Sequence, residues 1–171
     1  MASWVPSAVH MIQPYAYNAF PELFENPNTP VTAITAERTF WEKVTILHQE
    51  AHRKTPIPQR YLRHYYDLCK LARSSALESA LAQVGLLGDV VRFKERFYPS
   101  NWSRYDLAKP GSFKLLPTND AQIKHLERDY RDMQIMLFGN PPAFDSILEV
   151  LRHLEARINA LSFSASRPRP Y

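Results

Sequence analysis

Charged side chains border the apolar stripes of two predicted helices. In the helix expected over residues 60–72, Asp67 follows Arg63 by four residues and precedes Lys70 by three, so one helix face groups a carboxylate with cations. Lys43 lies at the edge of the buried face of the preceding helix. Such a cluster could orient a phosphate-bearing ligand through its cations, with Asp67 as acceptor or base. The alternative is a solvated face with local ion pairs, which the pattern alone favours.

A helical period begins at Glu37 and positions the first of these cations. Phe40, Val44 and Leu47 step by four and three residues, which gives one apolar stripe along a helix. Pro56 ends that helix. Further helices are predicted at about 60–72, 87–98, 123–137 and 141–161, and a loop over 99–118 with a helical turn near Tyr105.

The joint between the last two predicted helices is short. Gly139 is placed to end the first as a C′ glycine. Asn140 is placed to cap the second, with Pro141 at its first position. This spacing predicts an antiparallel helical hairpin.

Residues 1–36 differ from the rest because repeated prolines exclude a long helix. Two short segments, 8–13 and 31–35, are predicted to be strands. Two strands cannot form a stable sheet unaided, so they must lie on the helices or pair with something outside this chain. The predicted fold class is therefore mainly α: a helical bundle over 37–161, a short N-terminal β element, and a disordered tail over 162–171.

Composition sets wide limits on function. The chain has 171 residues and a formal net charge of +4, which permits phosphate binding without demonstrating it. Cys69 is the only cysteine, so no intrachain disulfide can form and a cytoplasmic protein is expected. The sequence shows no signal peptide and no apolar run long enough to cross a membrane, so no membrane partner is expected.

Two motifs resemble those of a known family. Residues 37–48, Glu-Arg-Thr-Phe-Trp-Glu-Lys-Val-Thr-Ile-Leu-His, resemble the "RTFWEK…LH" segment of AbiEii/AbiGii-type nucleotidyltransferase toxins. Residues 63–68, Arg-His-Tyr-Tyr-Asp-Leu, resemble the "R-(H/D)-x-Y-D-L" motif that follows it in that family. With weaker matches downstream, the resemblance covers about residues 31–160.

The resemblance implies an activity and a set of site residues. Members of the family move a nucleoside monophosphate from an NTP onto an RNA or protein acceptor, with Mg²⁺, and they belong to bacterial toxin–antitoxin and phage-exclusion (abortive infection) systems. Lys43 matches the family lysine that faces the nucleotide phosphates, and Asp67 matches an active-site aspartate. Arg63 matches the basic start of the second motif and is expected to bind nucleotide. The implied partners are a nucleotide, tRNA or another RNA, and a cognate antitoxin.

The chain departs from the family pattern in one respect. The family uses a Gly-Ser turn followed by Asp-x-Asp or Asp-x-Glu to hold Mg²⁺, and this sequence contains neither acidic pair, so no metal ligand is assigned. The chain is then expected to be the C-terminal part of such an enzyme and not to be catalytic alone. It would be a truncated gene product, a piece excised from a longer protein, or a subunit completed by another polypeptide. One alternative is a non-catalytic helical module that binds nucleotide, RNA or antitoxin, and another is a purely structural remnant. The unpaired strands also make a homodimer plausible.

Weaker signals have simpler explanations. His48 and His52, four residues apart, could ligate a metal, although helical histidines are common. Aromatic residues could stack on bases, but on helices they more often belong to the core. Cys69 is expected to be a small buried hydrophobe, and the acidic residues of 129–132 are expected to lie on an exposed helix turn without a specific role.

Overall fold

Helices dominate the structure, a computed structural model that describes residues 5–161. The predicted tail over 162–171 lies outside the described residues. The helices are α1 (Ala16–Ala19), α2 (Ala36–Ala51), α3 (Leu62–Ala72), α4 (Ala76–Ala82), α5 (Val84–Phe97), α6 (Asp120–Met133) and α7 (Phe144–Asn159). Single 3₁₀ turns lie at Pro21–Leu23, Tyr105–Leu107 and Gln134–Met136. The mainly α fold class is confirmed, as is the helical turn near Tyr105.

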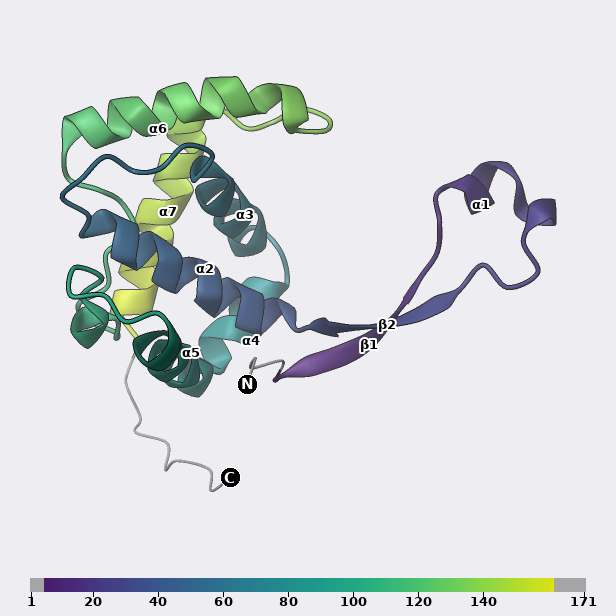
Figure 1. Ribbon diagram of the computed structural model, residues 1–171, viewed down its shortest axis with the longest axis horizontal. Coiled ribbons are helices and arrows are strands. Elements are labelled where there is room, and N and C mark those ends of the chain that lie inside the picture. The colour runs from purple at the N-terminus through teal and green to yellow at the C-terminus, as the bar shows by residue number, and fades with distance from the viewer. Residues whose placement is uncertain (1–4, 162–171) are drawn as a thin grey trace.

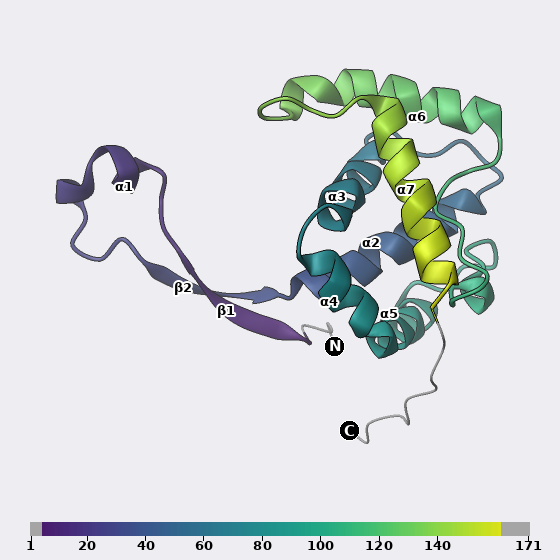
Figure 2. The same ribbon diagram turned by 180° about the vertical axis from the view of Figure 1, so that it is seen from behind.

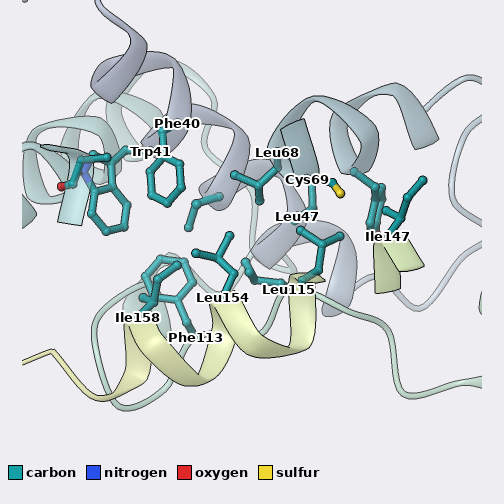
Figure 3. Packing of buried hydrophobic residues seen from close by; sticks show 14 of the residues in the cluster. Phe40, Trp41, Leu47, Leu68, Cys69, Phe113, Leu115, Ile147, Leu154 and Ile158 are labelled. Carbon is teal, nitrogen blue, oxygen red and sulfur yellow. The ribbon is translucent and has the colours of Figure 1, made fainter. Parts of the chain in front are cut away.

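Helix α2 lies at the centre of the helical body and packs against α3, α4 and α5 (Figure 1). The Thr35 hydroxyl accepts a hydrogen bond from the Arg38 backbone N–H at 3.3 Å and so caps its first turn. Phe40 and Leu47 are fully buried, and they pack with residues of α3 and α7 in one core (Figure 3). The Trp41 indole donates to the Ala80 carbonyl at 3.1 Å, which holds α4 against α2.

Helix α4 was not predicted from the sequence. Its seven residues are too few to show a helical period, yet Leu77, Ala80 and Leu81 are buried against the core. Helix α5 also begins three residues earlier than expected, at Val84 instead of Leu87. Both differences arise because tertiary packing stabilises helical turns whose local sequence signal is weak.

The predicted hairpin of the last two helices is wrong. Helix α6 ends at Met133, a 3₁₀ turn follows, and α7 begins only at Phe144, with Ala143 at the N-cap instead of Asn140. Leu137, which was expected inside the first of the two helices, lies after the 3₁₀ turn but still packs against the core, whereas Ile135 and Phe138 are 92% and 100% exposed. The longer joint lets α6 lie across one end of α7, and both helices pack on α3 (Figures 1 and 2).

The two N-terminal strands form an antiparallel ribbon that projects from the helical body (Figures 1 and 2). Strand β1 (Ser7–Ile12) pairs with β2 (Thr29–Ile34), with Val9 opposite Thr32. All of β1 is exposed, including Val9 and Met11 at 64% and 61%. The strands therefore do not lie on the helices, so the first of the two alternatives is wrong. Among residues 5–161, every helix is too short or too polar to span a bilayer.

Candidate functional site

The side chains of Lys43 and Asp67 meet where α2 packs against α3. The Lys43 ammonium donates to Asp67 Oδ2 at 2.7 Å, although the two residues are 24 positions apart. The lysine side chain is 20% exposed and the aspartate side chain 45% exposed, so the pair is open to solvent. The structure thus brings together the two residues that the sequence singles out for catalysis.

Burial of one face of each helix places this pair. Val44 and Leu47 of α2 and Leu68 of α3 are fully buried in the common core. Lys43 lies immediately before one of these core residues and Asp67 immediately before another. Their side chains therefore lie at the rim of the helix–helix contact, where long polar side chains reach solvent.

The start of α3 is fixed by a residue of α6 that the sequence analysis left without a role. Asp129 is only 8% exposed, and its two carboxylate oxygens accept from the backbone N–H groups of Arg60, at 2.6 Å, and Leu62, at 2.8 Å. Arg60 has a φ of +63°, a strained value for a non-glycine residue. The expectation that residues 129–132 have no specific role is thus wrong for Asp129, which caps the helix that carries Asp67.

A second lysine approaches the cluster from α5. The Lys94 ammonium donates to the Glu42 carbonyl at 3.1 Å. Burial, the largest cause, lowers the pKa of Lys94 to about 8 together with the charges of Arg38 and Lys43, while the Glu42 carboxylate acts in the opposite direction. A cation held in this way adds positive potential next to Lys43. Lys94 was not among the site residues expected from the sequence.

Arg63, the predicted nucleotide-binding arginine, lies on α3 one turn before Asp67. Its side chain is exposed, and within residues 5–161 it forms no hydrogen bond or ion pair. Its positive charge lowers the pKa of the neighbouring His64. Arg63 is therefore next to the Lys43–Asp67 pair without being joined to it, and its guanidinium is available to a ligand.

The pair lies on an open surface. A hollow of about 270 Å³ is lined by Glu95, Arg104, Asp106 and neighbouring residues of the loop after α5. Neither Lys43 nor Asp67 lines this hollow.

The structure disfavours a metal-ligand role for His48. Its Nε2 lies 3.0 Å from the Arg104 carbonyl oxygen, and its Nδ1 accepts from the Lys114 backbone N–H at 3.2 Å, so both ring nitrogens are occupied. No group of three or more His, Cys, Asp or Glu side chains within residues 5–161 could hold a metal ion. His48 instead ties the loop over 99–118 to the core.

Acidification is expected to destabilise the protein through His48. The side chain is fully buried, and burial lowers its pKa to about 4 from an ordinary value near 6.5. The unfolded chain therefore binds the proton first, and stability present above pH 6.5 is lost as the pH falls toward 4. We expect a loss of roughly 2–3 kcal/mol from this group, measured by urea unfolding at pH 7 and pH 4.5.

His48→Gln serves as the test variant and His153→Gln, an exposed change on α7, as its control. The first should show a smaller stability difference between the two pH values, and the second should keep the wild-type difference. Equal differences in all three proteins would contradict the assignment to His48.

Base stacking was an alternative to core packing for Trp41, Tyr65, Tyr66 and Trp102, and two of these four aromatics are fully buried. Trp41 and Tyr65 are fully buried, as is Cys69, so core packing is confirmed for these residues. Trp102 is 36% exposed, and the Arg53 guanidinium stacks over its ring at 4.1 Å from the centroid. Base stacking therefore has no support at the first two positions.

Comparison with known proteins gives one match. The family model described as "Nucleotidyl transferase AbiEii toxin, Type IV TA system" matches residues 6–150. Searches of curated proteins and of solved structures gave no match. The match includes α2 and α3 entire, with both motifs that meet at Lys43 and Asp67. Because it extends over most of the 171 residues, the chain belongs to the AbiEii nucleotidyl transferase toxin family of type IV toxin–antitoxin systems.

Proposed function

We propose that this chain supplies the Lys43–Asp67 half of a nucleotidyl transfer site and is not catalytic alone. The intact site would move a nucleoside monophosphate from an NTP onto an RNA or protein acceptor. The observation that carries the proposal is the 2.7 Å contact between Lys43 Nζ and Asp67 Oδ2, from separate helices, on a solvent-accessible surface.

The chemistry assigns a role to each side chain. An acceptor hydroxyl oxygen bonds to the α-phosphorus, the bond from that phosphorus to the bridging oxygen breaks, and pyrophosphate leaves. Asp67 would take the hydroxyl proton, which requires the incoming phosphate to draw Lys43 away from it. Lys43 would then stabilise the negative charge on the phosphates, and Arg63 would bind phosphate oxygens through its planar guanidinium.

The described residues do not fit a Mg²⁺ site. Magnesium in nucleotide-dependent enzymes is held by carboxylates near the phosphates. Asp67 is paired with Lys43, and no group of three potential metal ligands occurs within residues 5–161. We therefore derive no step through the metal, and we propose that the carboxylates that hold it belong to another segment or another chain.

The exposed ribbon suggests where that other part would join. Within residues 5–161, β1 and β2 pair only with each other, so each has an edge that no described strand covers, and Val9, Met11 and Val31 are exposed on them. Unpaired strand edges pair readily with further strands. We propose that the ribbon adds to the sheet that holds the metal-binding carboxylates, which would complete the cleft around Lys43.

Nucleotide binding tests the proposal. We expect ATP or CTP at millimolar concentration, with Mg²⁺, to shift the NMR signals of Lys43, Arg63 and Asp67 and to raise the melting temperature only slightly. Lys43→Met should weaken binding about tenfold, since it removes a charged hydrogen-bond donor. Lys124→Met removes an exposed lysine of α6 and should change nothing. Signal changes confined to other residues, or equal binding by both variants, would count against the proposal.

A second candidate is a non-catalytic binding module, favoured by the lack of a metal-ligand group within residues 5–161. Such a module would bind nucleotide, RNA or an antitoxin in the bacterial cytoplasm without transferring a nucleotide. Adding the missing transferase part distinguishes the two candidates, because only the first predicts that labelled NMP becomes attached to an acceptor. A homodimer formed through the ribbon edges is a separate possibility, which light scattering measures directly.

A further inference from the structure

The imidazole of His64 lies beside the Lys43 ammonium, on the turn of α3 that precedes Asp67. His64 Nδ1 is 3.1 Å from Lys43 Nζ. We propose that His64 positions Lys43 through Nδ1 and offers its Nε2–H as an additional donor to the phosphate-bearing ligand. This inference rests on the proposed function of the Lys43–Asp67 pair and names a further binding group within it.

The donor capacity of lysine fixes which nitrogen of His64 carries hydrogen. An ammonium group has three N–H donors and no acceptor lone pair. One donor is used by the Asp67 carboxylate at 2.7 Å, and a second points to His64 Nδ1. Nδ1 must therefore accept, and the single hydrogen of a neutral imidazole must be on Nε2.

The surroundings of the ring keep it neutral. Burial, the largest cause, and the charges of Lys43 on α2, Arg63 on α3 and Lys94 on α5 together lower the pKa of His64 to about 4. The Asp67 carboxylate on α3 acts in the opposite direction. At neutral pH the imidazole is thus an acceptor for Lys43 rather than a competing cation.

The orientation of the ring leaves Nε2 free for a ligand. The Tyr61 ring packs edge-to-face on the His64 ring, with centroids 5.2 Å apart and an interplanar angle of 82°. Within residues 5–161, Nε2 has no hydrogen-bond partner. It is also absent from the buried atoms that lack a partner, so this nitrogen is not fully buried. A donor that faces solvent next to a lysine and an exposed arginine suits a phosphate oxygen.

The first test uses the unaltered chain and needs no ligand. ¹H–¹⁵N NMR of the imidazole should show hydrogen on Nε2 and none on Nδ1, and the ring should stay neutral at pH 6. Hydrogen on Nδ1, or a charged ring at that pH, would overturn the positioning of Lys43. This result is independent of nucleotide binding, so it separates a failure of this inference from a failure of the proposed function.

The second test separates the two nitrogens with paired variants. The amide of His64→Asn falls near the position of Nδ1, and that of His64→Gln near Nε2. We expect H64N to keep the wild-type NMR signal of the Lys43 ε-methylene but to bind inorganic triphosphate about tenfold more weakly. We expect H64Q to shift the Lys43 signal while keeping more of the triphosphate affinity than H64N.

The exposed histidine of α7 supplies the matched control. His153→Asn and His153→Gln should leave both readouts at wild-type values. Wild-type triphosphate affinity in H64N would overturn the donor role of Nε2, as would a wild-type chain that binds no triphosphate. An unchanged Lys43 signal in H64Q would overturn the positioning role, and a thermal melt of each variant verifies that it is folded.

Discussion

Replacing Asp129 with alanine is expected to destabilise the protein by about 3 kcal/mol, because two buried backbone donors lose a charged acceptor. The carboxylate accepts from Arg60 N and Leu62 N, and its residue is 8% exposed, so water cannot easily replace it. Urea unfolding at pH 7 measures the loss. Asp129→Asn keeps the size but offers a single acceptor oxygen, so we expect an intermediate value.

Asp132→Ala is the matched control for this prediction, since Asp132 is an exposed acidic residue of the same helix. It should change stability by less than about 0.5 kcal/mol, as most surface substitutions do. The Asp129 variant should also disturb the NMR signals of His64 and Asp67, whose helix begins at the lost cap. If both alanine variants unfold at the same urea concentration, the capping role is wrong.

Replacing Arg53 with methionine is expected to lower the free energy of unfolding by about 3 kcal/mol, because the buried Glu50 carboxylate then keeps only the Gln49 amide and loses its cationic partner. Glu50 is fully buried, and Arg53 donates to both of its oxygens, at 2.5 and 3.0 Å. Methionine keeps most of the aliphatic stem, so the loss arises mainly from the unpaired charge and from the lost stacking on Trp102. Urea unfolding again gives the free energy.

The double variant Glu50→Leu, Arg53→Met sharpens this test. Replacing a buried ion pair with apolar side chains is often close to neutral, so the double variant should be more stable than Arg53→Met alone. Lys54→Met, at the exposed neighbouring position, controls for loss of a positive charge. A double variant less stable than the single one would show that the pair itself, and not the stranded charge, stabilises the fold.

The local pattern was enough to predict the helices that carry the site. The stripe that begins at Phe40 is the buried face of α2, and the motif around Asp67 lies on α3 as expected. Motif resemblance, rather than helical period, indicated that Lys43 and Asp67 would meet. The family assignment is confirmed by the match over residues 6–150, whereas the roles of the two side chains stay predictions.

What the sequence analysis missed depends on contacts between distant segments. Asp129 and Leu62 are 67 positions apart, and Lys94 and Glu42 are 52 apart. Neither pair can be recognised from a short sequence pattern, because each hydrogen bond joins a side chain of one partner to the backbone of the other, far away in the sequence. The false hairpin had the opposite cause: Gly139-Asn140-Pro141 matches local stop and start signals, but α6 already ends at Met133 and α7 begins only at Phe144.

Strand β2 ends at Ile34, and after Thr35 the chain continues directly into α2. Arg38 of that helix also contacts the residues that lead into β1, because its guanidinium donates to the Val5 carbonyl at 3.1 Å. The same side chain pairs with Glu42 at 2.8 Å. The ribbon is thus anchored to the same helical turns that precede Lys43. If a partner bound to the ribbon changes the position of Lys43, the partner and a phosphate ligand must alter each other's affinity by the same factor.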